Sequence, residues 1–211
     1  SLLRSQLEDL EAPGEALKID ITQSPDTIVN TIKSSLKEKS EFGLFGIGFM
    51  GKILSRNLAG KGFKLSLYNR HVPRREENVA ANFIKEFPEL SSAQAFDDIE
   101  AFANSLQMPR KIMLMVNAGK VTDRVISDLL PFLSEGDIII DGGNSNYNAT
   151  EERVKMLKSQ NIRFIGAGVS GGEAGASKGF SIMSGGDAFV YGKVEEYMVA
   201  LAAKDADGMP C

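Results

Sequence analysis

From residue 42 onward, short runs of aliphatic and β-branched residues alternate with longer amphipathic stretches. The short runs are apolar throughout, as in parallel strands buried on both faces, and the longer stretches repeat their apolar positions at helical spacing. The pattern predicts strands at Phe42–Ile47, Lys64–Tyr68, Lys111–Val116, Asp137–Ile140 and Arg163–Gly166. It predicts helices at Met50–Lys61, Arg75–Phe87, Asp97–Leu106, Lys120–Leu133 and Thr150–Gln160. This order predicts an α/β fold with a Rossmann-type, doubly wound parallel sheet over residues 41–211.

The pattern is different in the first forty residues. Apolar residues alternate as in a strand at Leu17, Ile19 and Ile21. Ser24 then suits a helix N-cap and Pro25 the first helical position, and one face of that helix carries Ile28, Ile32 and Leu36. A polar linker, residues 37–40, follows. We therefore expect residues 1–40 to be the tail of a separate domain.

Composition limits the classes of function. Among 211 residues, 43% are hydrophobic and 25% charged, which is enough apolar material for a globular core, and the net charge is -4. That balance gives no general attraction to nucleic acid or to an anionic membrane surface, and no apolar run is long enough to span a membrane. The single cysteine, Cys211, ends the chain, so a reducing, cytoplasmic setting is expected. Because the chain starts with Ser1, we expect both ends to be cut from a longer protein.

A glycine-rich motif follows the first predicted strand. Gly46, Gly48 and Gly51 form a GxGxxG run that leads directly into the next predicted helix. In this context the glycines permit a tight turn, the approach of a pyrophosphate to backbone N–H groups, and close packing of helix on strand. The alternative is a glycine-rich turn without a ligand.

The end of the second predicted strand distinguishes the two nicotinamide cofactors. An acidic residue at this position would accept hydrogen bonds from the ribose 2′-hydroxyl of NAD. The sequence has Asn69, Arg70 and His71 there, with Arg74 and Arg75 close behind. A strand end without a carboxylate and with an arginine favours the 2′-phosphate of NADP, with Arg70 as its first ligand. The alternative for Arg70 is an ordinary solvated arginine, and His71 is more typical of a loop residue than of a catalyst.

Three further motifs resemble those of the 6-phosphogluconate dehydrogenase family. Ile139–Ser145 reads IIDGGNS, which resembles the IDGGNS turn of that family, and Gly166–Gly172 resembles its GxGVSGG loop. Ser184–Gly186 stands where the family usually has PGG. The resemblance covers about residues 42–211. The wider β-hydroxyacid dehydrogenase superfamily shares the glycine loop and a VSGG turn, and it stays an alternative.

The resemblance implies NADP-dependent oxidation of 6-phosphogluconate at C3, followed by decarboxylation to ribulose 5-phosphate in the pentose phosphate pathway. It places Asn144 beside the nicotinamide and the substrate, and Met50 near the nicotinamide. Ser170, Gly171 and Gly172 would hold the substrate through a hydroxyl and backbone N–H groups. The alternatives are structural: Asn144 would cap the following helix, and Ser170 would satisfy its own loop.

A fourth turn departs from the family pattern. Val116, Asn117 and Ala118, followed by Gly119, match a VKAG turn near the adenosine half of the cofactor, with Asn117 in place of the lysine. The replacement removes a positive charge from the expected cofactor site. No cluster with metal-ligand spacing, catalytic carboxylate pair or Ser/His/Asp set is recognisable, so no metal is expected.

The resemblance also implies that functional parts lie downstream of Cys211. In the family, the proton-transfer lysine and acid belong to a helical region that follows this part, and the helical domain shapes the substrate pocket and the homodimer. We therefore expect this chain to bind a dinucleotide without turning over substrate. A non-catalytic dinucleotide-binding module is the third class of function that stays open.

The segment ahead of the predicted sheet has a resemblance of its own. Residues 3–13, with the SQxxxLExP-like stretch, and residues 16–21 resemble the C-terminal end of a gluconokinase, an enzyme that makes 6-phosphogluconate. This implies a multifunctional protein of gluconate utilization in which a kinase precedes the dehydrogenase. An unrelated N-terminal extension is the alternative.

Overall fold

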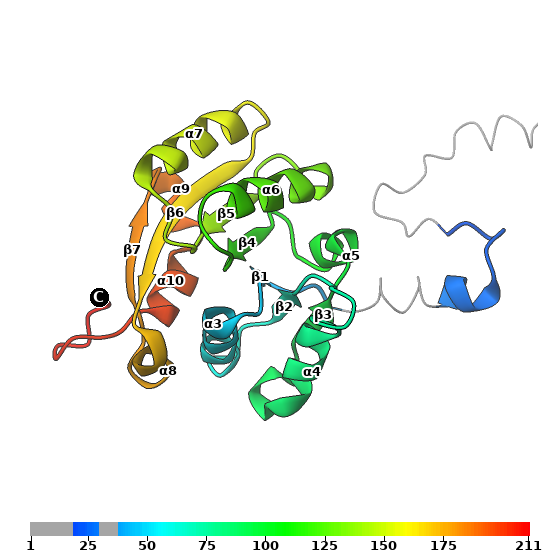
Figure 1. Ribbon diagram of the computed structural model, residues 1–211, viewed down its shortest axis with the longest axis horizontal. Helices are drawn as coiled ribbons and strands as arrows, with labels where there is room; N and C mark the ends of the chain where they lie inside the picture. Colours follow the sequence, from blue (N-terminus) through cyan, green and yellow to red (C-terminus); the bar gives the residue numbers. More distant parts are fainter. Residues whose placement is uncertain (1–18, 30–37) are drawn as a thin grey trace, which may run out of the picture. The chain divides into compact units, whose positions relative to one another are not determined.

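The structure, a computed structural model, describes residues 19–29 and 38–211 (Figure 1). The chain forms two compact units, residues 1–38 and 39–211. The second unit contains a sheet of seven strands in the order β3-β2-β1-β4-β5-β6-β7. All neighbouring strands are parallel except β6 and β7, which are antiparallel. The predicted α/β class with a doubly wound Rossmann-type sheet is confirmed.

The strands have the following bounds: β1 Phe42–Phe45, β2 Leu65–Tyr68, β3 Gln94–Phe96, β4 Lys111–Leu114, β5 Ile138–Asp141, β6 Arg163–Ser170 and β7 Ser181–Gly185. The helices are α3 Phe49–Ala59, α4 Val79–Glu86, α5 Ile99–Asn104, α6 Lys120–Leu129, α7 Tyr147–Lys158, α8 Gly175–Lys178, α9 Ala188–Gly192 and α10 Glu195–Leu201. Short 3₁₀ turns lie at Pro88–Leu90, Leu130–Phe132 and Gly172–Ala174.

The central strands are buried on both faces, which explains their unbroken apolar runs. In β5, Ile138 and Ile140 belong to the core beneath α3, α4 and α10, whereas Ile139 belongs to the core beneath α5, α6 and α7. Figure 1 shows α5, α6 and α7 along one face of the sheet and α3 and α4 along the other. Two apolar layers therefore hold the sheet rigidly, and the loops at the carboxyl ends of its strands start from fixed positions.

Several element ends differ from the prediction. The strands predicted for β1 and β4 were too long at their carboxyl ends. Apolar residues such as Ile47 and Val116 continue past the last residue of each strand into the following loop. The helix predicted from Arg75 starts at Val79, since a tight turn closed by reciprocal backbone bonds between Val72 and Glu76 comes first. The strands β3 and β7 and the helices α8–α10 were not predicted. β3 has only three residues, and β7 is an exposed edge strand without a buried alternation.

In the first unit the structure describes residues 19–29. Ser24 caps a helix that begins at Pro25, because the Thr27 amide donates to its hydroxyl over 3.3 Å. The predicted cap is confirmed. The predicted strand is wrong at Ile19 and Ile21, since the Asp20 carboxylate accepts bonds from the Thr22 amide and hydroxyl and closes a turn. Leu17, Ile32 and Leu36, which completed the two predicted elements, lie outside the described residues.

The predicted linker, residues 37–40, ends inside the second unit. Residue 37 lies outside the described residues, but Ser40 is buried. Its amide donates to the Ser105 carbonyl over 2.8 Å, and its own carbonyl accepts from Gln107 over 2.9 Å. Ser40 is thus part of the packed sheet unit, not of a solvated linker.

Candidate functional site

The loops that follow β1, β4 and β5 meet at the carboxyl edge of the sheet and enclose a cleft of about 370 Å³. The cleft lies where the strand order turns from β1 to β4, the switch point at which ligands of doubly wound sheets bind. The residues that line it are Gly48, Phe49, Met50, Gly51, Met115, Val116, Asn117, Ala118, Gly142, Gly143, Asn144 and Val169. Seven of the predicted cofactor residues are brought together here: Gly48, Met50, Gly51, Val116, Asn117, Ala118 and Asn144.

The glycine turn between β1 and α3 is closely packed at two of its glycines and open at the third. Gly46 has φ +105°, a conformation that disfavours other residues, and a Cβ there would lie 2.6 Å from the Met115 carbonyl oxygen. A Cβ on Gly51 would overlap the Gly46 carbonyl oxygen. A Cβ on Gly48 would instead enter open space, because it meets no atom within 4 Å. The turn thus leaves its backbone accessible at Gly48, where a pyrophosphate could approach.

The electrostatics of this cleft come from the backbone. Among the described residues that line it, none carries a charged side chain. No side chain in the described part of the chain caps α3, so the amide groups of its first turn remain available at the cleft. A helix N-terminus carries a partial positive charge and attracts anions. The cleft therefore suits a phosphate group held by backbone N–H donors.

The turn after β4 forms the opposite side of the cleft. Its Asn117 side chain is exposed, and the backbone carbonyl of this residue accepts a hydrogen bond from the Thr122 hydroxyl over 3.1 Å. Asn117 stands where the family pattern has a lysine. Among the described residues that line the cleft, no other side chain supplies a positive charge in its place.

Asn144 joins the turn after β5 to strand β6. It has φ +59°, and its side-chain amide forms two hydrogen bonds with Val169: Oδ1 accepts from the amide over 2.8 Å, and Nδ2 donates to the carbonyl over 3.2 Å. The hypothesis that Asn144 caps the following helix is wrong, because Asn146 caps α7 by accepting from the Asn148 amide. Asn144 keeps one N–H and one lone pair for a ligand.

A buried arginine that the sequence analysis did not identify supports the same turn. Arg153 on α7 is 4% exposed and pairs with the buried Asp141 at 2.9 Å. It also donates to the Ser145 hydroxyl over 2.9 Å, to the Gly119 carbonyl over 3.2 Å and to Asp123 over 2.8 Å. One guanidinium thus links the turn after β5 to the turn after β4. The signal in the sequence was its position four residues before the buried Leu157 on the same helix face.

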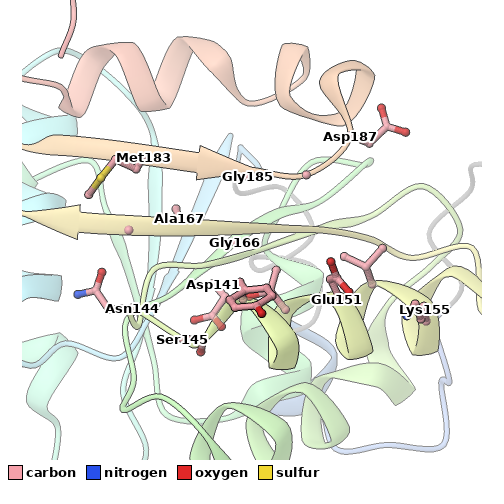
Figure 2. Close-up of a pocket in the computed structure, with 15 residues that line it drawn as sticks. Asp141, Asn144, Ser145, Glu151, Lys155, Gly166, Ala167, Met183, Gly185 and Asp187 are labelled. Carbon is pink, nitrogen blue, oxygen red and sulfur yellow. The ribbon is translucent and has the colours of Figure 1, made fainter.

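A second, larger cavity of about 710 Å³ lies between α7 and strands β6 and β7. Figure 2 shows Asn144 and Ser145 at one side of it, Glu151 and Lys155 on α7, and Met183 on β7. Asn144 lines both this cavity and the cleft. The charged residues around the larger cavity are three acids and one base, Asp141, Glu151, Asp187 and Lys155. Arg153 compensates Asp141, which leaves the acids Glu151 and Asp187 and the base Lys155, so the lining offers an anionic sugar phosphate no net positive charge.

The predicted substrate residues lie just beyond the cleft. Ser170 ends β6 and is exposed, one residue after Val169, which lines the cleft. Gly171 and Gly172 follow with φ values of +149° and +51°. The Ser170 hydroxyl forms no hydrogen bond within residues 38–211 as the structure describes them. The alternative that it satisfies its own loop thus finds no support, and the hydroxyl is available to a ligand.

At the end of β2 the structure corrects the view that this strand end lacks a carboxylate. Glu76, on the tight turn that follows, accepts hydrogen bonds from Arg70 Nε over 3.2 Å and from Arg70 Nη2 over 3.0 Å. The Arg70 guanidinium holds the pKa of the Glu76 carboxyl below its usual value, mainly through this bonding. The turn folds the chain back on itself, so an acid six residues away in sequence reaches the arginine. His71 Nδ1 lies 3.9 Å from Asp97.

Asn69 connects this strand end to the glycine turn. Its Oδ1 accepts from the Ile47 amide over 3.1 Å, and its Nδ2 donates to the Arg70 carbonyl over 3.1 Å and to Glu76 over 3.3 Å. Asn69, Arg70 and His71 do not line the 370 Å³ cleft, but Asn69 bonds directly to its glycine turn. A ligand that extends from the cleft along the end of β2 would therefore reach Arg70.

Two other properties concern only residues 19–29 and 38–211. No helix in those ranges is both long and apolar enough to span a membrane. Nor do they contain a group of three or more histidine, cysteine, aspartate or glutamate side chains that could hold a metal ion.

Comparison with known proteins gives consistent matches. Residues 41–208 match the family described as the NAD binding domain of 6-phosphogluconate dehydrogenase. The decarboxylating 6-phosphogluconate dehydrogenase of Chlamydia muridarum is 48% identical over 172 residues, which are 82% of this chain and 35% of that protein. The Staphylococcus aureus enzyme of the same name is 45% identical over 171 residues, 81% of this chain and 35% of that protein. The chain thus spans about a third of the length of these relatives.

Comparison with solved structures finds the same fold. The 6-phosphogluconate dehydrogenase of Plasmodium falciparum, solved without ligands, with its cofactor NADP+ and with its substrate 6-phosphogluconate, superposes with a TM-score of 0.72. It is 37% identical, and the match covers 81% of this chain and 36% of that one. A 3-hydroxyisobutyrate dehydrogenase of Mycobacterium tuberculosis, 20% identical, has a TM-score of 0.63 over 77% of this chain and 52% of its own, a likeness of fold alone. This chain belongs to the family of the NAD binding domain of 6-phosphogluconate dehydrogenase.

Proposed function

We propose that the cleft binds NADP and that the longer protein to which this chain corresponds oxidises and decarboxylates 6-phosphogluconate to ribulose 5-phosphate. The observation that carries the proposal is the convergence of three motifs on one cleft: the glycine turn, the Val116–Gly119 turn and the turn bearing Asn144. The relatives named 6-phosphogluconate dehydrogenase supply the substrate in this proposal.

The residues fit a dinucleotide. The open space at Gly48 and the uncapped α3 suit the pyrophosphate, and the apolar Met50 and Val116 suit flat rings. NADP, when bound, supplies the hydride acceptor. Asn144 and Ser170 would hold the substrate, with Gly171 and Gly172, at the end of the cleft formed by Val169. The hydroxyl of Ser170 and the remaining N–H of Asn144 would donate to substrate oxygens.

The binding test is calorimetric titration of the purified 211-residue chain with NADP and with NAD. We expect NADP to bind more tightly, because Arg70 directly follows Asn69, which bonds to the glycine turn, and its guanidinium would supply a cation for the 2′-phosphate. If the chain binds neither NADP nor NAD, the proposal is contradicted. A second titration, with NADP and 6-phosphogluconate on a protein extended past Cys211, separates a dehydrogenase from a binding module, since only the former produces NADPH.

Replacing Arg70 by alanine is expected to weaken NADP binding by about ten- to a hundredfold while changing NAD binding little. A charge-assisted contact of arginine with a phosphate is worth about 1.5–3 kcal/mol. NAD has no 2′-phosphate and therefore does not make this contact. The measurement is the ratio of the two dissociation constants for the variant and the unchanged chain. Equal losses for both cofactors would contradict the assignment of Arg70 to the 2′-phosphate.

The purified chain is expected to produce NADPH from 6-phosphogluconate only at background rate. Oxidation at C3 needs a base to take the hydroxyl proton, and decarboxylation leaves an enediol that an acid must protonate. In the described part of the chain, no lysine, histidine or carboxylic acid lines the cleft. Absorbance at the NADPH band, followed with both ligands at saturation, checks this, and a steady rise above an enzyme-free control would contradict it.

For residues 1–40 we propose the tail of a gluconokinase, fused ahead of the dehydrogenase in a cytoplasmic protein whose full-length form is a homodimer. The support is the resemblance of residues 3–13 and 16–21 together with the Ser24-capped helix. The coding sequence upstream of Ser1 tests the fusion: kinase motifs are expected there, and a start codon within a few codons of Ser1 would contradict it.

A further inference from the structure

The turn after β2 places one carboxylate directly on the arginine proposed to bind the 2′-phosphate. Glu76 contacts Arg70 through both of its oxygens, one on Nε and one on Nη2. This is the two-point geometry in which a guanidinium also binds a phosphate. The Glu76 side chain is 37% exposed and that of Arg70 is 69% exposed, so an incoming ligand can reach the pair.

Glu76 is held in this position by more than the ion pair. Its backbone is fixed by reciprocal hydrogen bonds with Val72, of 2.8 and 2.9 Å. The Asn69 amide also donates to its carboxylate over 3.3 Å, and Asn69 in turn accepts from the Ile47 amide of the glycine turn. Contacts with Val72 and Asn69 therefore hold the acid in the turn, and it does not depend on Arg70 alone for its place.

We propose that Glu76 is a specificity-determining residue of the cofactor site, which lowers the affinity for NADP by competing with the 2′-phosphate for the guanidinium of Arg70. The inference rests on the proposed function. A phosphate that takes the Nε and Nη2 donors must displace the carboxylate. One that takes the remaining Nη1 and Nη2 donors must sit beside an ionised carboxylate of like charge. Either arrangement costs affinity for NADP, whereas NAD, which has no 2′-phosphate, makes neither demand.

The test compares Glu76→Gln with a matched control, Glu77→Gln. Both variants remove one negative charge from the same turn, but Glu77 accepts from the Arg74 amide over 2.6 Å and makes no contact with Arg70 among the contacts of the described residues. Calorimetric titration at about 150 mM salt is expected to show NADP binding tightened about three- to thirtyfold by Glu76→Gln. NAD affinity, and both affinities in Glu77→Gln, are expected to change by less than about twofold.

A third variant separates competition for Arg70 from general charge repulsion. In an Arg70→Met background the gain from Glu76→Gln is expected to fall below about twofold, because there is no guanidinium left to release. Thermal unfolding of each variant checks that the sheet unit is still folded. Persistence of the full gain without Arg70 would overturn the proposal, as would an unchanged NADP affinity in Glu76→Gln. If the unaltered chain binds neither dinucleotide, the proposed function fails, and this inference falls with it.

Discussion

Replacing Arg153 by methionine is expected to lower the free energy of unfolding by about 3–5 kcal/mol, which corresponds to roughly 6–20 °C in melting temperature for a domain of this size. The substitution leaves the buried Asp141 carboxylate without its cationic partner and also removes the bonds to Ser145 and to the Gly119 carbonyl. Chemical denaturation followed by circular dichroism measures the loss.

Two companion variants test the cause of that loss. Arg124→Met removes an arginine whose pair with Asp128, 3.8 Å long, is exposed, so it should cost less than about 1 kcal/mol. Combining Arg153→Met with Asp141→Asn should recover part of the stability, because the uncompensated buried charge is gone. A loss of similar size in the Arg124 and Arg153 variants would show that the network around Arg153 has no special role.

Replacing Gly48 by alanine is expected to weaken binding of both NADP and NAD by about a hundredfold or more while leaving the melting temperature unchanged. The added methyl group meets no protein atom within 4 Å, and the Gly48 backbone, with φ -77°, accepts an ordinary residue. In the proposed binding mode the methyl would instead occupy space that the pyrophosphate needs. Loss of two charge-assisted hydrogen bonds at about 1.5–3 kcal/mol each gives the expected size.

Gly51→Ala is the contrasting variant in the same motif. Its methyl group would overlap the Gly46 carbonyl oxygen, so the strand-to-helix packing must shift and the free energy of unfolding must fall. Thermal melts and calorimetric titrations on the two variants separate the roles of the two glycines. Unaltered dinucleotide binding by Gly48→Ala would place the ligand elsewhere.

The periodicity of the sequence predicted the sheet well where strands are buried on both faces. The unbroken isoleucines of β5 and the apolar run of β4 admit few other interpretations. The edge strands were missed because they are not buried on both faces. The three residues of β3 are only partly buried, and β7 is mostly exposed, so neither carries the apolar signal that marks a strand.

The motifs of the candidate site were predictable from the sequence, but the contacts between its side chains were not. The glycine turn and Asn144 stood out because their spacing is typical of a family. Glu76 was missed because its contact with Arg70 depends on the turn closed by Val72, and such a return of the chain is not visible in residue spacing. Arg153 was missed because a charged residue on a helix is usually solvated, and the partners that satisfy it when buried, above all Asp141 at the end of β5, are brought to it only by the fold.

Asn144 has a thermodynamic consequence because it is common to two cavities. Its amide bonds to Val169 in the cleft beside the glycine turn, and the same side chain forms part of the wall of the larger cavity against α7. A ligand in either cavity that reorients this amide changes the free energy of filling the other. Linkage makes the effect mutual: the factor by which an occupant of the larger cavity alters dinucleotide affinity equals the factor by which the dinucleotide alters affinity for that occupant.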